Sequence, residues 1–518
     1  MASVLNYKMA VKRIAVRGVN WVGDAVMTTP ALRSVRLSNP GAHITLLVKK
    51  HIAGLFEKDP SIDQIMVLDD EFEGASGKLR LARRLKKGGF DEIILLQNAF
   101  GAGLSAWLAR IPRRAGYARD LRGPLLTKPV PYVGEDRRMH HVDYYLNLLE
   151  KAGLGRVEKS LPWIHLAPEE RLKARQLLQG LERPVIALTP GAAFGSSKRW
   201  PVGSFIKLAD LIKTRLGGSV ALLGSASEAQ AAQQIIKQAT SGPGRILNLA
   251  GRTGIREFAA VLSECDAVVS NDSGAMHVAC AVGSRVVALF GSTSPELTGP
   301  SGHSTVMKKQ YGCSPCFKRT CAKGKAAPPC LESITPEEVF EALRSALPSR
   351  RAVFFDRDGV LCKDPGYLSR WEDFEPAAGL EQLVKLRDMG FAIIGITNQS
   401  GINRGTISED FVKEVNAHFG KYGFEAFYYC PHRPDEICSC RKPSPGMLLE
   451  ASRQMNIDLK GSYLVGDKPS DILAASSAGA FPVLIGPDGP ADIPGAGPFF
   501  RAGSLKEAVE FILKREAC

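Results

Sequence analysis

The sequence predicts an α/β protein made of three consecutive domains, each with a parallel sheet covered by helices. Three observations support this fold class. Short runs of β-branched and other apolar residues alternate with helical stretches as far as about residue 340. A charged helical stretch and a proline-containing connection interrupt the alternation near residue 165. A new strand-like run begins abruptly near residue 352, and a chain of 518 residues has room for several domains. We therefore expect domains over residues 1–165, 166–348 and 349–518.

The composition excludes several classes of protein. Hydrophobic residues make up 45% of the chain and charged residues 23%, as in ordinary globular proteins, which excludes a disordered chain. No window approaches 18 consecutive apolar residues, so we expect no membrane span. The amino-terminal stretch has no apolar core of signal-peptide length, so we expect a cytoplasmic protein.

The charge balance indicates anionic partners. Lysine and arginine number 67 against 53 acidic residues, a net charge of +14. Such an excess suits phosphorylated substrates, an anionic membrane surface or nucleic acid, and a solvated basic surface is the alternative. No segment has the form of a basic nucleic-acid arm, so nucleic acid is not expected. Any contact with the inner leaflet of the cytoplasmic membrane should be peripheral and driven by charge.

Each domain begins with runs typical of buried parallel strands. In the first domain these runs cover residues 12–18, 43–50, 63–70 and 91–98. In the second they cover residues 184–191, 219–225, 245–251, 266–274 and 285–293. After a helix predicted over residues 335–347, the third domain opens with a strand that leads into Asp356. Two such domains facing each other would form a cleft at the carboxyl ends of their strands.

The third domain carries acidic and polar side chains where its strands end. Asp356 and Asp358 follow the first strand, Thr397 follows the second, and Asp467 follows a later one after Lys442. A carboxylate that attacks a phosphate needs a cation to relieve their repulsion. Asp356 and Asp467, with the backbone carbonyl near Asp358, would supply oxygen ligands for Mg²⁺. We expect Asp356 to be the nucleophile and Asp358 the acid and base. Lys442 and Thr397 would hold the phosphoryl oxygens.

The order of these motifs resembles the haloacid dehalogenase phosphatase superfamily. Between about residues 350 and 490, the stretches DPGYL, TNQSGINRG and CPHRPDEICSCRKPSPGM are similar to its phosphatases of heptose bisphosphate. The resemblance implies a Rossmannoid domain whose substrate pocket is formed by Asp364, Gly366, Tyr367, Asn398, Gln399, Ser400, Arg441 and Lys468. Phosphatases of histidinol phosphate share much of this pattern, so histidinol phosphate is the alternative substrate. This chain departs from the pattern at Cys362, where a polar residue is expected, and in its short cysteine loop.

One imidazole and three thiols lie close together within that cysteine loop. They are Cys430, His432, Cys438 and Cys440. This set suits a tetrahedral, structural Zn²⁺ with no open position, and a reduced, metal-free loop is the alternative. The zinc would fix the loop that brings Arg441 and Lys442 into the site.

The first domain places Asp24 at the beginning of a helix, after a turn that contains Gly18 and Gly23. From residue type alone, Asp24 is a helix cap or a functional carboxylate. The stretches NWVGDAVM, SSKRWP and NDSGAMHVACAVGSRVVALFGSTSP resemble glycosyltransferase family 9 over about residues 11–345, and CSPCFKRTC is similar to its heptosyltransferase II members. The resemblance implies two Rossmann-like domains in a GT-B arrangement and an inverting transfer without an obligatory metal. Asp24 would then be the base that takes the proton of the acceptor hydroxyl.

The resemblance also implies that the second domain binds the leaving ADP. Asp272, Ser273 and Gly274 open a helix, so backbone N–H groups can meet the pyrophosphate. Lys198 and His277 would add a positive charge and a hydrogen-bond donor, and Glu228 would bind ribose or adenine. A helix cap at Asp272 and a surface position for Glu228 are the alternatives.

A basic rim in the first domain would suit an anionic acceptor, lipid A with its inner core sugars. Asn98, Arg113 and Arg114 are expected on loops beyond a strand. Arg137, Arg138, His140 and His141 would extend the rim or form an ordinary exposed helix start.

A second cysteine group consists of Cys313, Cys316, Cys321 and Cys330. Its CxxC end allows a soft metal. Because the remaining spacing is irregular, reduced structural thiols are the favoured interpretation.

The two resemblances together imply a bifunctional enzyme of lipopolysaccharide inner-core assembly. One part would remove the 7-phosphate of heptose bisphosphate through an aspartyl-phosphate with Mg²⁺. The other would transfer heptose from ADP-heptose to the lipid A core acceptor. The alternatives are hydrolysis of histidinol phosphate and a non-catalytic amino-terminal module that binds the core oligosaccharide.

Overall fold

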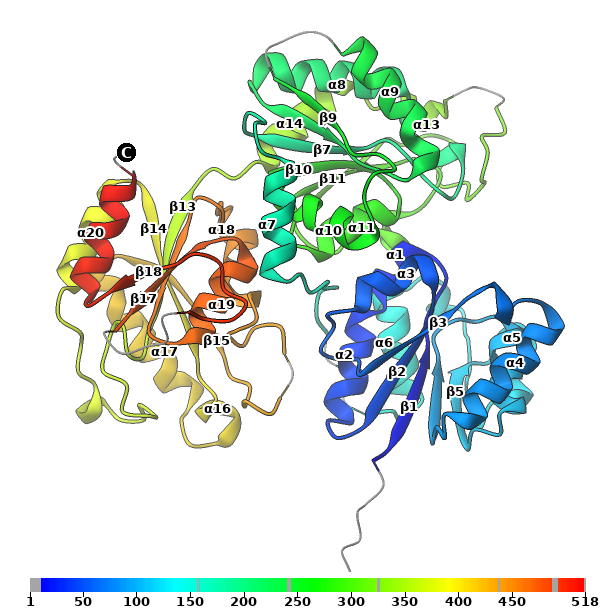
Figure 1. Ribbon diagram of the computed structural model, residues 1–518, viewed down its shortest axis with the longest axis horizontal. Coiled ribbons are helices and arrows are strands. Elements are labelled where there is room, and N and C mark those ends of the chain that lie inside the picture. Colours follow the sequence, from blue (N-terminus) through cyan, green and yellow to red (C-terminus); the bar gives the residue numbers. More distant parts are fainter. Residues whose placement is uncertain are drawn as a thin grey trace, which may run out of the picture. The chain divides into compact units, whose positions relative to one another are not determined.

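The structure is a computed structural model that describes residues 11–516, apart from residues 156, 158, 240–243, 324–326, 437 and 487–491. The first ten residues of the stretch inspected for a signal peptide lie outside the described residues. The described residues form three sheets of six strands each. Figure 1 shows these sheets with the helices that cover them. Contacts between Cα atoms group the chain into two compact units. The first unit holds residues 1–165, 184–262 and 268–342, and the second holds residues 166–183, 263–267 and 343–518.

The first sheet is parallel, with its strands in the order β3-β2-β1-β4-β5-β6. The strands are β1 Arg13–Arg17, β2 His43–Lys49, β3 Gln64–Leu68, β4 Glu92–Leu95, β5 Arg113–Tyr117 and β6 Lys128–Val130. The helices are α1 Val22–Met27, α2 Thr29–Ser38, α3 Lys50–Ala53, α4 Gly74–Lys87, α5 Phe100–Leu108 and α6 His141–Lys151. Helices α4 and α5 pack together on the face that carries Ala15, and α2 packs against α6 (Figure 1).

The second sheet has the strand order β12-β11-β10-β7-β8-β9. Its strands are β7 Val185–Thr189, β8 Ser219–Leu222, β9 Ile246–Asn248, β10 Ala267–Asn271, β11 Val286–Phe290 and β12 Ser304–Lys308. The accompanying helices are α7 Pro168–Leu177, α8 Val202–Arg215, α9 Ala229–Gln238, α10 Ile255–Glu264, α11 Gly274–Ala281, α12 Pro295–Thr298, α13 Pro329–Glu332 and α14 Pro336–Ala346. Strands β7, β10 and β11 are buried along their whole length, which explains why they are apolar apart from Thr189, Ser270 and Asn271 at the carboxyl ends of β7 and β10.

The third sheet is ordered β15-β14-β13-β16-β17-β18 and is parallel. Its strands are β13 Arg351–Asp356, β14 Phe391–Asn398, β15 Phe424–Cys430, β16 Tyr463–Gly466, β17 Phe481–Ile485 and β18 Phe500–Ala502. Its helices are α15 Leu383–Asp388, α16 Gly401–Arg404, α17 Glu409–His418, α18 Gly446–Met455, α19 Pro469–Ala478 and α20 Leu505–Glu516.

Alternate residues of β13 enter two separate cores, one on each face of the third sheet. Val353 and Phe355 pack in the core that also contains residues of α15 and α20. Ala352 and Phe354 pack in the core formed with α18 and α19 (Figure 1). Because side chains alternate along a strand, a strand buried on both faces must be apolar throughout. Burial of β13 on both faces therefore explains the apolar run before Asp356.

The three sheets share one strand order. In each sheet the first three strands follow one another toward one edge, and the fourth strand pairs with the first on its other side. The neighbouring pairs at this point are β1 with β4, β7 with β10, and β13 with β16. Ligands of open α/β sheets bind beyond the carboxyl ends of the strands at such a switch point. The topology therefore indicates one binding region for each sheet.

The sequence did not predict several short strands toward the sheet edges. Strand β6 has three residues, one of which is Pro129, and it lies at the edge of its sheet. Proline cannot donate a hydrogen bond and is tolerated at an edge, so such a strand lacks a clear sequence pattern. Strands β12 and β18 are likewise edge strands.

Candidate active sites

Two regions of the chain gather polar and charged side chains at the switch points of their sheets. In the third sheet, Asp356 is the last residue of β13, and Thr397 and Asn398 end the neighbouring β14. Asp467 directly follows β16, which pairs with β13 on its other side. Lys442 comes from the loop between β15 and α18. Parallel pairing thus brings residues more than 100 positions apart to one edge of the sheet.

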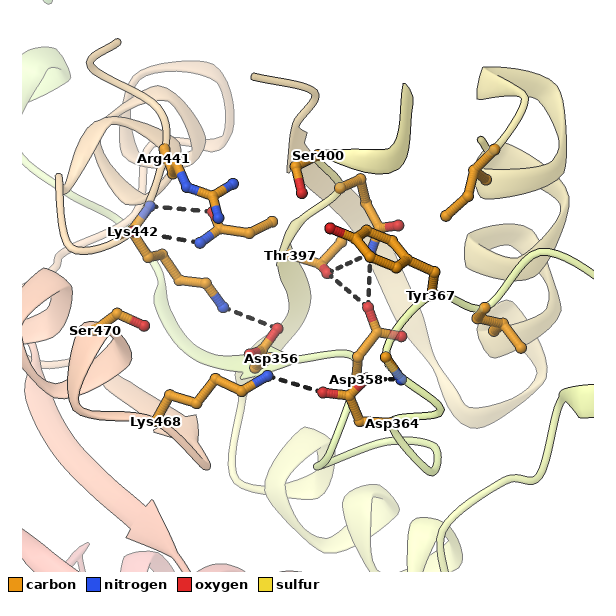
Figure 2. Close-up of a pocket in the computed structure, with 15 residues that line it drawn as sticks. Asp356, Asp358, Asp364, Tyr367, Thr397, Ser400, Arg441, Lys442, Lys468 and Ser470 are labelled. Atoms are coloured by element: carbon orange, nitrogen blue, oxygen red, sulfur yellow. Dashed lines mark hydrogen bonds and ion pairs between the residues drawn. The ribbon is translucent and has the colours of Figure 1, made fainter. Parts of the chain in front are cut away.

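These residues surround a cavity of about 340 Å³, shown in Figure 2. The residues that line it and were predicted as site residues are Asp356, Asp358, Asp364, Gly366, Tyr367, Thr397, Asn398, Gln399, Ser400, Arg441, Lys442 and Lys468. Asp467 does not line the cavity. Three further lining residues were not predicted, namely Leu368, Ile407 and Ser470.

Lys442 is buried between two carboxylates at the floor of this cavity. Its Nζ lies 2.8 Å from Asp356 Oδ1 and 2.6 Å from Asp471 Oδ1. Burial by itself would lower the pKa of Lys442, but the two carboxylates raise it above its usual value. Asp471, which is fully buried, was not predicted as a site residue. Its position four residues after Asp467, in the first turn of α19, was the available signal.

The Asp358 carboxylate is held by several donors around the cavity. Arg357 donates to it from Nε at 2.9 Å and from Nη2 at 3.1 Å. Gln399 Nε2 donates at 2.6 Å, and Thr397 Oγ1 lies at 3.3 Å. The buried Cys362 places its Sγ 3.6 Å from Asp358 Oδ1. A thiol is thus accommodated where a polar residue was expected from the sequence.

The acidic group that could hold a cation contains the two predicted carboxylates, Asp356 and Asp467, and adds Asp471, which was not predicted. Ligand atoms of Asp356, Asp467 and Asp471 all lie within 4.8 Å of one another, whereas Asp358 is not part of this group. Asp467 Oδ1 is buried without a hydrogen-bond partner among the described residues. Burial raises the pKa of Asp467, and burial raises that of Asp356 to about 7 although Lys442 acts in the opposite direction. An unpartnered carboxylate oxygen in an acidic cluster fits a hard divalent cation such as Mg²⁺.

The outer wall of the cavity carries Asp364 and Lys468, which form an ion pair at 2.9 Å (Figure 2). The Gly366 N–H donates to Asp364 Oδ1 at 2.9 Å. Burial opposes ionisation of Asp364, but Lys468 and this N–H keep its pKa below the usual value. Gly366 has a φ of +88°, a conformation that favours glycine.

The four predicted zinc ligands lie together in the loop after β15. The Sγ atoms of Cys430 and Cys438 are 3.6 Å apart, as are those of Cys438 and Cys440. His432 Nδ1 lies 3.4 Å from Cys430 Sγ and 3.2 Å from Cys440 Sγ. A tetrahedral zinc with Zn–S bonds of about 2.3 Å separates two sulfurs by about 3.8 Å, so these residues fit the ion. The Arg441 N–H donates to Cys438 Sγ, which ties the cluster to the cavity wall.

The second site lies between the first two sheets, where α1 and α11 come close together. A Cβ at Gly274 would lie 2.9 Å from Val22 Cβ, and one at Gly23 would lie 2.8 Å from His277 Cδ2. Both contacts are shorter than real Cβ contacts, so glycine is needed at both positions. This close approach brings the beginning of α1, with Asp24, next to the beginning of α11.

A cavity of about 850 Å³ extends from this contact. The predicted site residues that line it are Asp24, Lys198, Glu228, Asp272, Ser273, Gly274 and His277. Further lining residues that the sequence analysis did not single out include Thr189, Phe194, Thr293 and Phe317. The structure therefore brings all seven predicted residues to one cavity.

Asp272 does not cap α11, because no side chain makes a capping hydrogen bond at that helix. Its carboxylate accepts a hydrogen bond from Thr293 Oγ1 and forms an ion pair with Lys198 at 2.6 Å. Lys198 also lies over the ring of Phe194, 4.9 Å from its centroid. The backbone N–H groups at the start of α11 are therefore free of a side-chain cap and face the cavity region lined by Ser273 and Gly274.

Glu228 and His277 both lie in the wall of the larger cavity, where neighbouring groups fix their positions. The Ser225 N–H donates to Glu228 Oε2 at 2.6 Å. A Cβ at Gly191 would lie 1.5 Å from Glu228 Oε1, so the carboxylate lies directly against the loop after β7. His277 is buried, and burial lowers its pKa to about 4, which leaves a neutral imidazole near pH 7.

A smaller cavity of about 290 Å³ opens beside Asp24 within the first domain. His141 Nδ1 lies 3.1 Å from Asp24 Oδ1, and no side-chain cap forms at α1. Asn98 Nδ2 donates to Tyr144 Oη at 2.9 Å. Other lining residues include Trp21, Arg119, Tyr132 and Arg137. Asp24 lines both cavities, so a group bound in one can meet a group bound in the other at this carboxylate.

The structure corrects the expected basic rim. Arg113 and Arg114 begin β5 and do not lie on loops beyond a strand. Arg114 donates to the backbone carbonyls of Leu125 and Ile111, at 2.7 and 2.5 Å. Because β5 starts at the edge of the sheet opposite to the strand carboxyl ends, these arginines cannot line the cavity. Arg119, which the sequence analysis did not single out, lines it in their place.

The thiols of Cys313, Cys316, Cys321 and Cys330 do not form a compact ligand set. All four residues are described, and no three of their sulfurs belong to a group within 4.8 Å. The loop instead forms one wall of the larger cavity through Phe317. Its backbone is held by Ser292, whose carbonyl accepts from the Cys316 and Phe317 N–H groups at 3.0 and 2.7 Å.

Among the described residues, no helix is long and apolar enough to cross a membrane.

Comparisons with known proteins match the two regions of the chain that contain these cavities. The profile of Glycosyltransferase family 9 (heptosyltransferase) matches residues 78–327, and a HAD-hydrolase-like profile matches residues 439–505. Lipopolysaccharide heptosyltransferase 2 of Salmonella typhimurium is 32% identical over 346 residues, which cover 65% of this chain and 98% of the relative. D-glycero-beta-D-manno-heptose-1,7-bisphosphate 7-phosphatase of Helicobacter pylori (strain J99) is 35% identical over 177 residues, which cover 32% of this chain and 98% of the relative.

A solved structure supports the predicted fold class. The Escherichia coli ADP-heptose lps heptosyltransferase II superposes with a TM-score of 0.55 at 28% identity, covering 64% of this chain and 98% of that chain. The prediction of two Rossmann-like domains in a GT-B arrangement, followed by a haloacid dehalogenase-like domain, is confirmed. The chain is therefore an enzyme with a glycosyltransferase part that belongs to glycosyltransferase family 9 and a phosphatase part that belongs to the haloacid dehalogenase-like hydrolases.

Proposed function

We propose that this chain is a bifunctional enzyme of lipopolysaccharide inner-core heptose biosynthesis. The phosphatase part would remove the 7-phosphate of D-glycero-D-manno-heptose 1,7-bisphosphate. The transferase part would move heptose from ADP-heptose to the lipid A inner-core acceptor. The observation that carries this proposal is the presence of two separate sites on one chain, each next to its own switch point and each within a region whose relatives act in heptose metabolism. A cytoplasmic location, with peripheral contact at the inner membrane, belongs to the same proposal.

In the phosphatase part, Asp356 would attack the phosphorus of the 7-phosphate and form an aspartyl-phosphate. Asp358 would give its proton to the leaving O7 of the sugar and then take a proton from the water that cleaves the acyl phosphate. Lys442, which already contacts Asp356, would hold a phosphoryl oxygen while charge develops there. Thr397 and the backbone around Asn398 would hold the other oxygens.

The acidic group of Asp356, Asp467 and Asp471 would hold Mg²⁺. When bound, this ion supplies positive charge that offsets the repulsion between the Asp356 carboxylate and the substrate phosphate. Zn²⁺ in the loop of Cys430, His432, Cys438 and Cys440 would be structural, because all four protein ligands fill its coordination sphere.

In the transferase part, Asp24 would take the proton from the acceptor hydroxyl as that oxygen attacks the anomeric carbon of the donor. A single displacement of this kind inverts the anomeric configuration. His141, in contact with Asp24, would orient the carboxylate. Lys198 and the N–H groups at the start of α11 would stabilise the charge of the leaving ADP, and Glu228 would bind its ribose or adenine.

A comparison of substrates tests the phosphatase proposal. The full chain should release phosphate from heptose 1,7-bisphosphate much faster than from histidinol phosphate. The reverse order of kcat/KM would favour histidinol phosphate as the substrate and contradict the proposal.

An assay with ADP-heptose and a heptose-truncated lipid A core acceptor tests the transferase proposal. The wild-type chain should form the extended core, and Asp24→Asn should abolish transfer. Binding of the acceptor without transfer by the wild-type chain would indicate a non-catalytic module.

A further inference from the structure

Phe317 presents an uncovered aromatic ring in the wall of the larger transferase cavity. It lines that cavity, and 53% of the residue stays exposed in the folded chain. Its φ of 55° lies in the left-handed region, which residues with a large side chain seldom adopt. Such a conformation persists only where the surrounding structure enforces it, and it is concentrated at ligand sites. A large apolar side chain that is held in this way and left uncovered indicates a contact with a bound molecule.

The backbone on both sides of Phe317 is fixed by hydrogen bonds to two other loops. The Phe317 N–H donates to the Ser292 carbonyl at 2.7 Å. The Ser197 N–H donates to the Arg319 carbonyl at 3.2 Å, and a Cβ at Gly195 would lie 2.1 Å from that same carbonyl oxygen. We call Ser197 and Ser292 the two anchors. Because both anchors bind the backbone, the loop is held in place without any contact of the Phe317 ring.

The two anchors are also next to the residues that hold Asp272 at the start of α11. Lys198 follows the first anchor and pairs with the Asp272 carboxylate at 2.6 Å. Thr293 follows the second anchor and donates a hydrogen bond to the same carboxylate. Phe317 is therefore fixed relative to the groups that would bind the pyrophosphate of the donor.

The strand order distinguishes the two ends of this cavity. Glu228, proposed for the ribose or adenine, follows β8 on one side of β10, whereas α12 follows β11 on the other side. The chain after α12 meets the first domain, since His140 Nε2 lies 3.0 Å from the Gly299 carbonyl oxygen. The next residue, His141, contacts Asp24. The end of the cavity near β11 is therefore the end at which the donor sugar would meet the proposed base.

We propose that Phe317 packs against the sugar of the nucleotide-sugar donor and is a specificity-determining residue of the transferase part. The inference rests on the proposed function, in which that donor is ADP-heptose. Phe317 follows β12, the neighbour of β11, and its N–H binds Ser292, two positions after β11 ends. The C–H groups of a sugar form an apolar face that an aromatic ring can cover. The base and ribose would instead lie toward Glu228, beyond β7.

Calorimetric titration of the full chain with ADP and, separately, with ADP-heptose tests this contact, in the absence of acceptor. Phe317→Asn should raise the Kd of ADP-heptose by about tenfold and leave the Kd of ADP within about twofold of the wild type. Asparagine tolerates a positive φ, so this variant keeps the loop conformation. In transfer assays the same variant should raise the KM for ADP-heptose and leave the inhibition constant of ADP unchanged.

Two further variants serve as controls. Phe317→Tyr keeps the ring and should bind both ligands like the wild type. Tyr311→Asn removes an aromatic ring from the same segment of the chain, but Tyr311 does not line the cavity, and its hydroxyl meets Lys323 Nζ at 3.4 Å. It should also keep both affinities. Weaker binding of ADP-heptose in Tyr311→Asn than in Phe317→Asn would overturn the proposal.

The two ligands separate a contact with the sugar from other roles of Phe317. Equal loss of ADP and ADP-heptose binding in Phe317→Asn would indicate a structural role or a contact with the nucleotide, and unchanged binding of both would indicate no contact. Either result would overturn the proposal, and the proposed function would stand if the wild-type chain transfers heptose. If the wild-type chain binds ADP-heptose with the expected dependence on Phe317 but transfers no heptose, the proposed function fails and the sugar contact stands.

Discussion

Lys442 forms ion pairs with Asp356, which lines the phosphatase cavity, and with the fully buried Asp471. Removing its charge leaves two buried acids without their shared cation, which is costly for folding and for catalysis. We expect Lys442→Met to lower the rate of phosphate release at saturating substrate by about a thousandfold and to lower the melting temperature. Assays of phosphate release and calorimetry measure the two effects.

Lys363→Met is the control for that change, because Lys363 is exposed and pairs only with the exposed Glu375 at 3.3 Å. It should change neither quantity appreciably. A Lys442→Met enzyme within about tenfold of the wild-type rate would contradict the assigned role.

His277 gives the transferase part a dependence of stability on pH. Burial lowers its pKa to about 4, whereas an unfolded histidine has a pKa of about 6.5. Below pH 6.5 the unfolded chain takes up a proton that the folded chain does not, so the stabilising contribution of the neutral side chain falls as pH drops from about 6.5 to 4. At pH 5 the loss is on the order of 2 kcal/mol.

We therefore expect the free energy of unfolding to fall more between pH 7 and pH 5 in the wild type than in His277→Gln. Denaturant unfolding at the two pH values measures this difference. His51→Gln, which changes an exposed histidine, should keep the wild-type dependence. Identical pH dependence in His277→Gln and the wild type would show that His277 is not a buried neutral group.

At the residue scale, the sequence predicted the type of reaction better than it predicted which residues contact one another. The phosphoryl-transfer site was predicted from four polar elements that follow the strands in order, because the Asp356 and Asp358 pair alone is a weak signal. The pairing of Lys442 with Asp471 was not predictable, because Lys442 comes from the loop after β15 and Asp471 from the first turn of α19, and the strand order brings them together. The same holds for Asp24 and His141, which are 117 positions apart.

At the scale of elements, the close approach of α1 and α11 joins the two domains of the transferase around their site. Gly274→Ala would place a Cβ against Val22. We expect it to lower the free energy of unfolding by about 1–3 kcal/mol and to raise the KM for ADP-heptose. Denaturant unfolding and initial rates measure the two effects.

Gly203→Ala is the matched control for that substitution. Gly203 lies in α8, and a Cβ there would meet nothing within 4 Å. Alanine should be neutral or slightly stabilising at this position, since it is the better helix former. Equal effects of the two substitutions would show that the approach of the helices imposes no constraint.

The cysteine loop after β15 is the second element with a testable role. Cys438→Ser should remove bound zinc and lower kcat/KM of the phosphatase by at least about tenfold, because Arg441 and Lys442 lose their support. Elemental analysis and phosphate release measure the two quantities. Cys313→Ser, in the other cysteine group, should keep both. Full phosphatase activity in a zinc-free Cys438→Ser enzyme would contradict the structural role of the ion.

The sequence predicted central elements more accurately than edge elements. The apolar runs of β1, β7 and β13 were recognised because both faces of these strands are buried. Strands β5 and β6, Arg113–Tyr117 and Lys128–Val130, are short and carry arginine, glycine or proline. The loops that follow them bring Arg119 and Tyr132 to the cavity beside Asp24, so missing the strands also meant missing these residues.

At the scale of the whole molecule, the chain combines two activities whose sites are formed by different sheets. The proposed catalytic carboxylates Asp24 and Asp356 follow or end strands of separate sheets, and no described residue lines both the phosphatase cavity and a transferase cavity. The two reactions should therefore be separable by single substitutions. The fusion itself requires no transfer of an intermediate between the sites, because the product of one proposed reaction is not the donor of the other.

The presence of two independent active sites is tested most directly by assaying both reactions with the intact chain and with two variants, Asp24→Asn and Asp356→Asn. We expect Asp24→Asn to lose heptose transfer from ADP-heptose and to keep phosphate release from heptose 1,7-bisphosphate. We expect Asp356→Asn to show the opposite pattern. Loss of both reactions in either correctly folded variant, or retention of the reaction assigned to the substituted carboxylate, would contradict the claim that one chain carries these two independent active sites.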